Sequence, residues 1–185
     1  MMVLLGGGID SSYIAFYLSH QKRKHVIGIH FDYGQASSSY EKKAIRDFSS
    51  ATGIDTMFEK ISFPMILDEY EYKFRNLLLL LASSPFSIER GCSRIFIGIH
   101  RDSPYYDASS LFLNDAQLLL DRYFGGSLQV SAPLIDLTKP EIWKLVKSFH
   151  GMFPLKYTYS CQNGIEFGCG YCPSCLDRKA LADEH

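Results

Sequence analysis

Short apolar runs alternate along the chain with longer segments in which apolar residues have helical spacing. The runs of strand length are residues 1–5, 25–31, 55–61, 94–99 and 128–132. Between them, amphipathic patterns predict helices at residues 13–20, 38–51 and 111–124 and from residue 138 onward. Near-continuous apolar runs are typical of buried parallel strands. The pattern therefore predicts an α/β fold with a doubly wound, mainly parallel five-stranded sheet.

The pattern changes between the third and fourth predicted strands. Residues 62–73 include Pro64 among tyrosines and acidic residues, so we expect irregular structure there. A strongly apolar helix begins at Arg75, and the leucines at residues 77–81 cover all of its faces. Such a helix is buried either in the core or in a homodimer interface. Since no linker is recognisable, we expect one domain over residues 1–185.

Three consecutive glycines separate the first predicted strand from the first predicted helix. The junction reads Gly6, Gly7, Gly8, Ile9, Asp10, Ser11 and Ser12. Glycine lets backbone N–H groups approach a ligand, and the start of a helix adds positive potential. One of Asp10, Ser11 or Ser12 is expected to cap the helix. The junction predicts a phosphate site, with a tight turn that binds no ligand as the alternative.

Four of the five cysteines lie close together in the sequence. Cys161, Cys169, Cys172 and Cys175 have the spacing C-x7-C-x2-C-x2-C. Four thiolates complete the coordination shell of Zn²⁺, so we expect a structural zinc site, with an iron–sulfur cluster as the weaker alternative. The metal would hold residues 157–185 against the sheet. Cys92 stands alone and is expected to be a small buried residue.

Composition and charge narrow the class of protein. The hydrophobic fraction of 46% is that of a folded globular protein, and the net charge of −1 gives no strong nucleic-acid signal. No apolar run is long enough to span a membrane, and the first residues lack the basic segment of a secretory signal. We therefore expect a cytoplasmic protein.

The predicted topology also indicates where a ligand binds. Ligands of open α/β sheets lie beyond the carboxyl ends of the strands. The loops at those ends are residues 6–12, 32–37, 100–109 and 133–139. We expect a ligand to contact these four loops.

Several short motifs match those of one known family in the same order along nearly the whole chain. They are Gly7-Gly8-x-Asp10-Ser11, Tyr33-Gly34-Gln35, Arg75-Asn76, Ile97-Gly98 with Asp102 and Tyr105-x-Asp107, Ala132-Pro133-Leu134, Leu137-Thr138-Lys139, and the cysteine segment with Arg178. With them, the chain resembles the 7-cyano-7-deazaguanine synthase (QueC-like) family of PP-loop ATP pyrophosphatases. It departs from the family's loop at Gly6, where the family has serine.

The resemblance implies an ATP-dependent carbon–nitrogen ligase that uses Mg²⁺ and contains structural zinc. The implied reaction adenylates the carboxylate of 7-carboxy-7-deazaguanine, lets ammonia displace AMP, and converts the amide to a nitrile with a second ATP. The implied catalytic residues are Asp10, Ser11, Arg75 and Lys139. The implied ATP-binding residues are those at positions 6–12 with His30 and Phe31. The implied substrate-binding residues are Tyr33, Gln35, Arg75, Asn76, Asp102, Tyr105 and Asp107.

Departures in the loops around residues 37–39 and 108–111 leave other functions open. One alternative is a divergent ligase that joins a deazaguanine carboxylate to a protein or to another amine, in defence against phage. A second is a zinc-stabilised nucleotide-binding module with weakened catalysis. A third is a related thiolase, which would need a redox-active cysteine, and only Cys92 lies outside the cluster.

Overall fold

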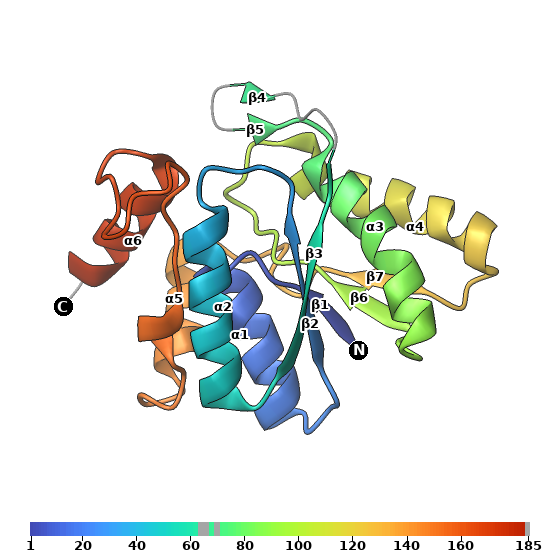
Figure 1. Cartoon of the computed structure of the whole chain (residues 1–185), viewed down its shortest axis with the longest axis horizontal. Coiled ribbons are helices and arrows are strands. Elements are labelled where there is room, and N and C mark those ends of the chain that lie inside the picture. Colours follow the sequence, from blue (N-terminus) through green and yellow to red (C-terminus); the bar gives the residue numbers. More distant parts are fainter. Residues whose placement is uncertain (63–66, 69–70, 184–185) are drawn as a thin grey trace.

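The core of the computed structural model, which describes residues 1–62, 67–68 and 71–183, is a five-stranded parallel sheet (Figure 1). Its order is β3 (Asp55–Lys60), β2 (Ile27–Asp32), β1 (Met2–Leu4), β6 (Arg94–Phe96) and β7 (Gln129–Ser131). Val3 of the central strand pairs with Gly28 on one side and Phe96 on the other. The predicted five-stranded parallel sheet is confirmed.

Helices cover both faces of the sheet (Figure 1). One face carries α1 (Ile9–Phe16), α2 (Ser38–Thr52) and α5 (Lys139–Lys147), and the other carries α3 (Arg75–Glu89) and α4 (Ser110–Phe124). Each face has its own apolar core, because each helix buries one stripe of side chains against the strands. Fully buried aliphatic or aromatic side chains stabilise the fold by about 1.5–3 kcal/mol each. The two cores together make the doubly wound arrangement.

Shorter elements complete the described chain. They are a π-helical turn (Tyr17–Gln21), two 3₁₀ helices (Tyr106–Ala108 and Leu155–Tyr157), the strands β4 (Leu67–Asp68) and β5 (Glu71–Tyr72), and α6 (Pro173–Asp183). Because β4 and β5 pair antiparallel, the expectation of irregular structure is wrong for that part of residues 62–73. Pro64 lies outside the described residues.

The start of α1 differs from the prediction. The helix begins at Ile9, and its N-cap is Gly8, in an extended conformation with no capping side chain. Asp10, Ser11 and Ser12 therefore lie inside the helix, and the expectation that one of them caps it is wrong. Gly7, with φ of 74°, makes the sharp bend that leads from the strand into the helix. At the start of α5 the capping box is complete, as the Thr138 side chain accepts from the backbone N–H of Glu141 and the Glu141 side chain accepts from that of Thr138.

The leucine-rich helix α3 is only partly buried by this chain. Leu80 is 1% exposed and packs in the core between α3 and the sheet, whereas Leu81 is 40% and Ile88 46% exposed. Core packing thus accounts for one side of the helix, and a homodimer interface stays a prediction. None of the helices in the described part of the chain is long and apolar enough to cross a membrane.

Gly98, just after β6, provides a test of how the sheet supports α1. A Cβ atom at Gly98 would lie 3.0 Å from the backbone nitrogen of Ser11 and 3.2 Å from its Cα. Since backbone atoms cannot turn aside, we expect Gly98→Ala to lower the free energy of unfolding by about 1–3 kcal/mol in urea titrations. Gly6→Ala is the control, because a Cβ at Gly6 would have no atom within 4 Å. Equal losses in the two variants would contradict this account.

Candidate active site

A cavity of about 270 Å³ lies at the carboxyl end of β1, where the connections to the neighbouring strands turn in opposite directions. This topological switch is where doubly wound folds place their ligands. The predicted site residues that line the cavity are Gly6, Gly8, Ile9, Asp10, Ser11, His30, Phe31, Tyr33, Gln35, Arg75, Asn76 and Lys139. The fold thus brings most of the predicted residues together.

The glycine loop (residues 6–11) is held on two sides. On one side, a Cβ atom on Gly7 would lie 3.3 Å from the Cα and carbonyl oxygen of Glu41 in α2, so only glycine fits without displacement. On the other side, the carbonyl oxygen of Gly7 accepts a 2.8 Å hydrogen bond from the backbone N–H of Tyr159. Ile9 and Asp10, in the first turn of α1, line the cavity. Their N–H groups have no partner within the helix, which suits an anion.

Lys139 and Asp10 form an ion pair between α5 and α1. Lys139 Nζ lies 2.5 Å from Asp10 Oδ2, and the two side chains are 22% and 18% exposed. The second oxygen, Asp10 Oδ1, is buried and has no hydrogen-bond partner among the described residues. A carboxylate oxygen in this state fits a hard cation such as Mg²⁺. The pair therefore places a cation and a ligand oxygen beside the glycine loop.

Glu41, which the sequence reasoning missed, is the centre of a second polar network. Its carboxylate accepts hydrogen bonds from Gln35 Nε2 at 2.8 Å and from Ser37 Oγ at 2.6 Å. His30 donates from Nδ1 to the carbonyl oxygen of Leu5, and its Nε2 lies 3.9 Å from Glu41 Oε2. Burial lowers the pKa of His30, so its ring is neutral at pH 7. The only sequence signal for Glu41 was a carboxylate in the first turn of the helix after the Tyr-Gly-Gln motif.

Two of the predicted substrate residues use their polar groups within the protein. Gln35 donates to the carbonyl oxygen of Phe31 and accepts from the backbone N–H of Tyr33, besides its contact with Glu41. Asn76 donates to the carbonyl oxygen of Asp107. These contacts hold the cavity wall in shape. Tyr33 and Arg75 also line the cavity, and burial raises the pKa of Tyr33 to about 12.

Gly7, Ser12, Asp102, Tyr105 and Asp107 do not line the cavity. Asp102 Oδ2 accepts from the backbone N–H of Lys139 at 2.7 Å, at the start of α5. Asp107 Oδ2 accepts from the backbone N–H of Asn76 at 3.0 Å, in the first turn of α3. No part of the 100–109 loop lines the cavity. ATP binding by Gly7 and Ser12, and substrate binding by Asp102, Tyr105 and Asp107, stay predictions.

The cysteine segment takes the place of that loop in the cavity wall. It contributes Tyr159, Ser160, Cys161, Gln162, Ser174, Asp177 and Arg178, and α5 adds Trp143. Sequence reasoning treated this segment only as a means of holding the tail against the sheet. Ser160 and Arg178 belong to the motif that accompanies the cysteines, and this was the available signal for a second role.

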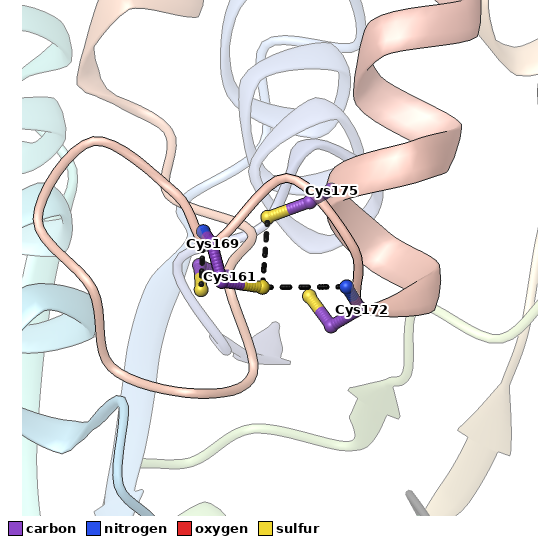
Figure 2. Close-up of side chains that lie close together, drawn as sticks. All are labelled: Cys161, Cys169, Cys172 and Cys175. Atoms are coloured by element: carbon purple, nitrogen blue, oxygen red, sulfur yellow. Dashed lines mark hydrogen bonds between the residues drawn. The ribbon is translucent and has the colours of Figure 1, made fainter.

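The four clustered cysteines converge on one point (Figure 2). Their Sγ atoms all lie within 4.8 Å of one another, and none is in a disulfide. Tetrahedral zinc with four thiolates needs sulfur atoms roughly 3.8 Å apart, so the donor set fits a thiophilic divalent metal. Burial opposes ionisation of Cys169, but hydrogen bonds from the backbone N–H groups of Tyr171 and Cys172 outweigh it and lower its pKa to about 6. The choice of zinc stays a prediction.

Replacing one ligand tests the metal site. We expect purified wild-type protein to contain one metal ion per chain, and Cys172→Ser to lose most of it, because three thiolates leave the shell open. The thermal midpoint should fall with it. Metal content by inductively coupled plasma mass spectrometry checks this, with Cys92→Ser as the control. Full metal content in Cys172→Ser, or equal loss in both variants, would contradict a four-cysteine centre.

Comparison with known proteins shows similar sequences over nearly the whole chain. The family model described as "Queuosine biosynthesis protein QueC" matches residues 1–71 and 70–184. A 7-cyano-7-deazaguanine synthase of Aquifex aeolicus is 29% identical, and the match covers 97% of this chain and 94% of the relative. The synthase of Nautilia profundicola is 26% identical over 94% of this chain and 89% of the relative.

Among solved structures, the NH3-dependent NAD synthetase of Campylobacter jejuni has a similar fold. The TM-score is 0.51 at 15% identity, and the match covers 84% of this chain and 65% of the synthetase. At this identity the likeness concerns the fold alone, and it agrees with the doubly wound parallel sheet.

Proposed function

The chain belongs to the family of the queuosine biosynthesis protein QueC, and on that premise we propose that it is an ATP-dependent ligase for a deazaguanine carboxylate. ATP adenylates 7-carboxy-7-deazaguanine or a close analogue, and ammonia or another amine then displaces AMP. The observation that carries the proposal is that the glycine loop, Lys139 and Arg75 line the same cavity. These groups suit a reaction in which highly charged pyrophosphate leaves the α-phosphorus of ATP.

In the first step a carboxylate oxygen of the substrate attacks the α-phosphorus of ATP. The bond from this phosphorus to the bridging oxygen breaks, and pyrophosphate leaves with the electron pair. The N–H groups at the start of α1 would hold the pyrophosphate, and Lys139 would offset the negative charge that develops on it. Bound Mg²⁺ would neutralise part of the phosphate charge, with Asp10 Oδ1 as one fitting ligand atom.

In the second step the amine nitrogen attacks the acyl carbon of the adenylate. The carbon–oxygen bond to AMP breaks, AMP leaves with the electron pair, and the nitrogen loses a proton to give an amide. Where the amine is ammonia, the oxygen of the primary amide would attack the α-phosphorus of a second ATP with loss of pyrophosphate and a proton. Loss of AMP and a second proton would then give the nitrile. Tyr33 and Arg75, which contact each other, line the cavity and would meet the deazaguanine. The amide groups of Gln35 and Asn76 are bound within the protein at both their oxygen and their nitrogen.

A product screen tests the proposed reaction. Purified protein is incubated with ATP, Mg²⁺ and 7-carboxy-7-deazaguanine, with ammonium or one of several primary amines, and the products are identified by mass spectrometry. We expect pyrophosphate, AMP and an amide or nitrile. ATP binding without turnover of any carboxylate would contradict the proposal and favour a nucleotide-binding module.

Lys139 should act mainly on the rate. We expect Lys139→Gln to lower kcat for pyrophosphate release by about 100-fold, because charge on the leaving group develops in the transition state, with a smaller change in KM for ATP. Lys144→Gln is the matched control, since Lys144 is an exposed lysine of the same helix. Equal steady-state kinetics for the two variants would exclude this role for Lys139.

Gly6 tests the departure from the family's loop. A Cβ atom at Gly6 would meet no atom within 4 Å, and Gly6 is not among the glycines with positive φ, so a serine fits there. The added hydroxyl offers one more donor to the pyrophosphate. We therefore expect Gly6→Ser to raise the rate of adenylation, measured as pyrophosphate release. An unchanged or lower rate would count against this interpretation of the loop.

A further inference from the structure

A short extended segment, residues 158–160, joins the metal centre to the glycine loop, and we call it the strap. The backbone N–H of Tyr159 donates to the carbonyl oxygen of Gly7 at 2.8 Å. The next residue after the strap is the metal-ligating candidate Cys161. The strap is therefore the shortest covalent path from the cysteine cluster to a direct contact with the loop.

Arg178 of α6 holds the strap by three hydrogen bonds from one nitrogen atom. Its Nη1 donates to the carbonyl oxygen of Thr158 at 3.2 Å, to Thr158 Oγ1 at 3.0 Å and to Ser160 Oγ at 3.3 Å. Thr158 is buried, and burial of these polar groups makes each unmade hydrogen bond costly. None of the described carboxylates forms an ion pair with Arg178, so its contacts with the strap are its main polar contacts.

Two cavities border the strap near Arg178. One cavity, the candidate active site, is lined by Tyr159, Ser160 and Arg178, and a second cavity is lined by these residues and Thr158. On these sides, the hydrogen bonds to Gly7 and from Arg178 help to hold the strap in position. The Tyr159 ring adds a stack on Tyr40 of α2, with ring centres 5.3 Å apart.

A bound metal would connect the strap to α6 a second time, in addition to the hydrogen bonds of Arg178. Cys161 follows the strap, whereas Cys172 and Cys175 lie at the start of α6, the helix that carries Arg178. A metal bound by all four thiolates would fix the strap to α6 at one end, and Arg178 fixes it at the other. Without the metal, only the hydrogen bonds of Arg178 would join α6 to the strap in this way.

We propose that Arg178 is a positioning residue that couples occupancy of the four-cysteine metal site to phosphate binding at the glycine loop. This coupling rests on the proposed function only because it assumes that the loop binds the pyrophosphate part of ATP. The metal and Arg178 together keep the strap in place, the strap holds the carbonyl oxygen of Gly7, and the loop keeps the conformation that a phosphate needs. Coupling between two binding sites is reciprocal, so bound pyrophosphate also slows loss of the metal.

The first experiment measures binding of magnesium pyrophosphate to the metal-loaded protein by isothermal titration calorimetry. We expect Arg178→Gln to weaken binding by about tenfold, within the usual range of coupling between sites. Arg178→Lys should recover part of the affinity, because an ammonium can still donate to Thr158. Lys179→Gln, which removes the neighbouring exposed charge, should bind as the wild type does.

The second experiment measures release of the metal to a chromophoric chelator. Saturating magnesium pyrophosphate should slow release several-fold in the wild type and in Lys179→Gln, but not in Arg178→Gln. A purely structural role for Arg178 would speed release equally with and without the ligand. If Arg178→Gln does not fold, Thr158→Val removes one of the same hydrogen bonds and should show a smaller loss in both measurements.

The outcomes separate this inference from the proposed function. Equal pyrophosphate affinity in wild type and Arg178→Gln, or equal protection of the metal in both, would overturn the coupling while leaving the ligase proposal intact. No binding of magnesium pyrophosphate by the wild type would overturn phosphate binding at the loop, and with it both proposals.

Discussion

The rest of the site depends on the contacts that hold the backbone of Gly7 from two sides. Its left-handed conformation turns the chain from the central strand into α1. Glu41 of α2 packs against its Cα side, and the N–H of Tyr159 holds its carbonyl oxygen. Both contacts come from elements that are distant in sequence and close together only in the folded chain. The loop is therefore preorganised by tertiary structure, and it needs no capping side chain at the start of its helix.

The charged groups that share the cavity with this loop come from different helices. The ion pair of Lys139 with Asp10 lies on the α5 side, and Arg75 enters from α3. The cysteine segment closes the remaining side. The matching 7-cyano-7-deazaguanine synthases align with nearly the whole of this chain, and the match to the family model includes the glycine loop and the cysteine segment. The segment that carries the four-cysteine cluster thus belongs to the wall of the site as well as to the tail.

The sequence predicted the sheet well because each strand is a buried apolar run between clear helix signals. It predicted the glycine loop and the four cysteines because their spacing carries the chemistry directly. It could not show that Asp107 accepts from the N–H of Asn76, 31 positions away, because a loop aspartate has the same appearance whether it meets a ligand or another helix. For the same reason, Glu41 was found only when the structure placed it beside the loop. Arg178, which the motif of the cysteine segment includes, was given no role until the structure placed it beside the strap.

Exchange of labelled pyrophosphate into ATP tests the central claim most directly, because it reports formation of the acyl-adenylate alone. The account predicts exchange that requires 7-carboxy-7-deazaguanine or a close analogue together with Mg²⁺, and that proceeds without any amine. Formation of ADP and phosphate without exchange, or exchange that is indifferent to the carboxylate, would contradict adenylation at the glycine loop.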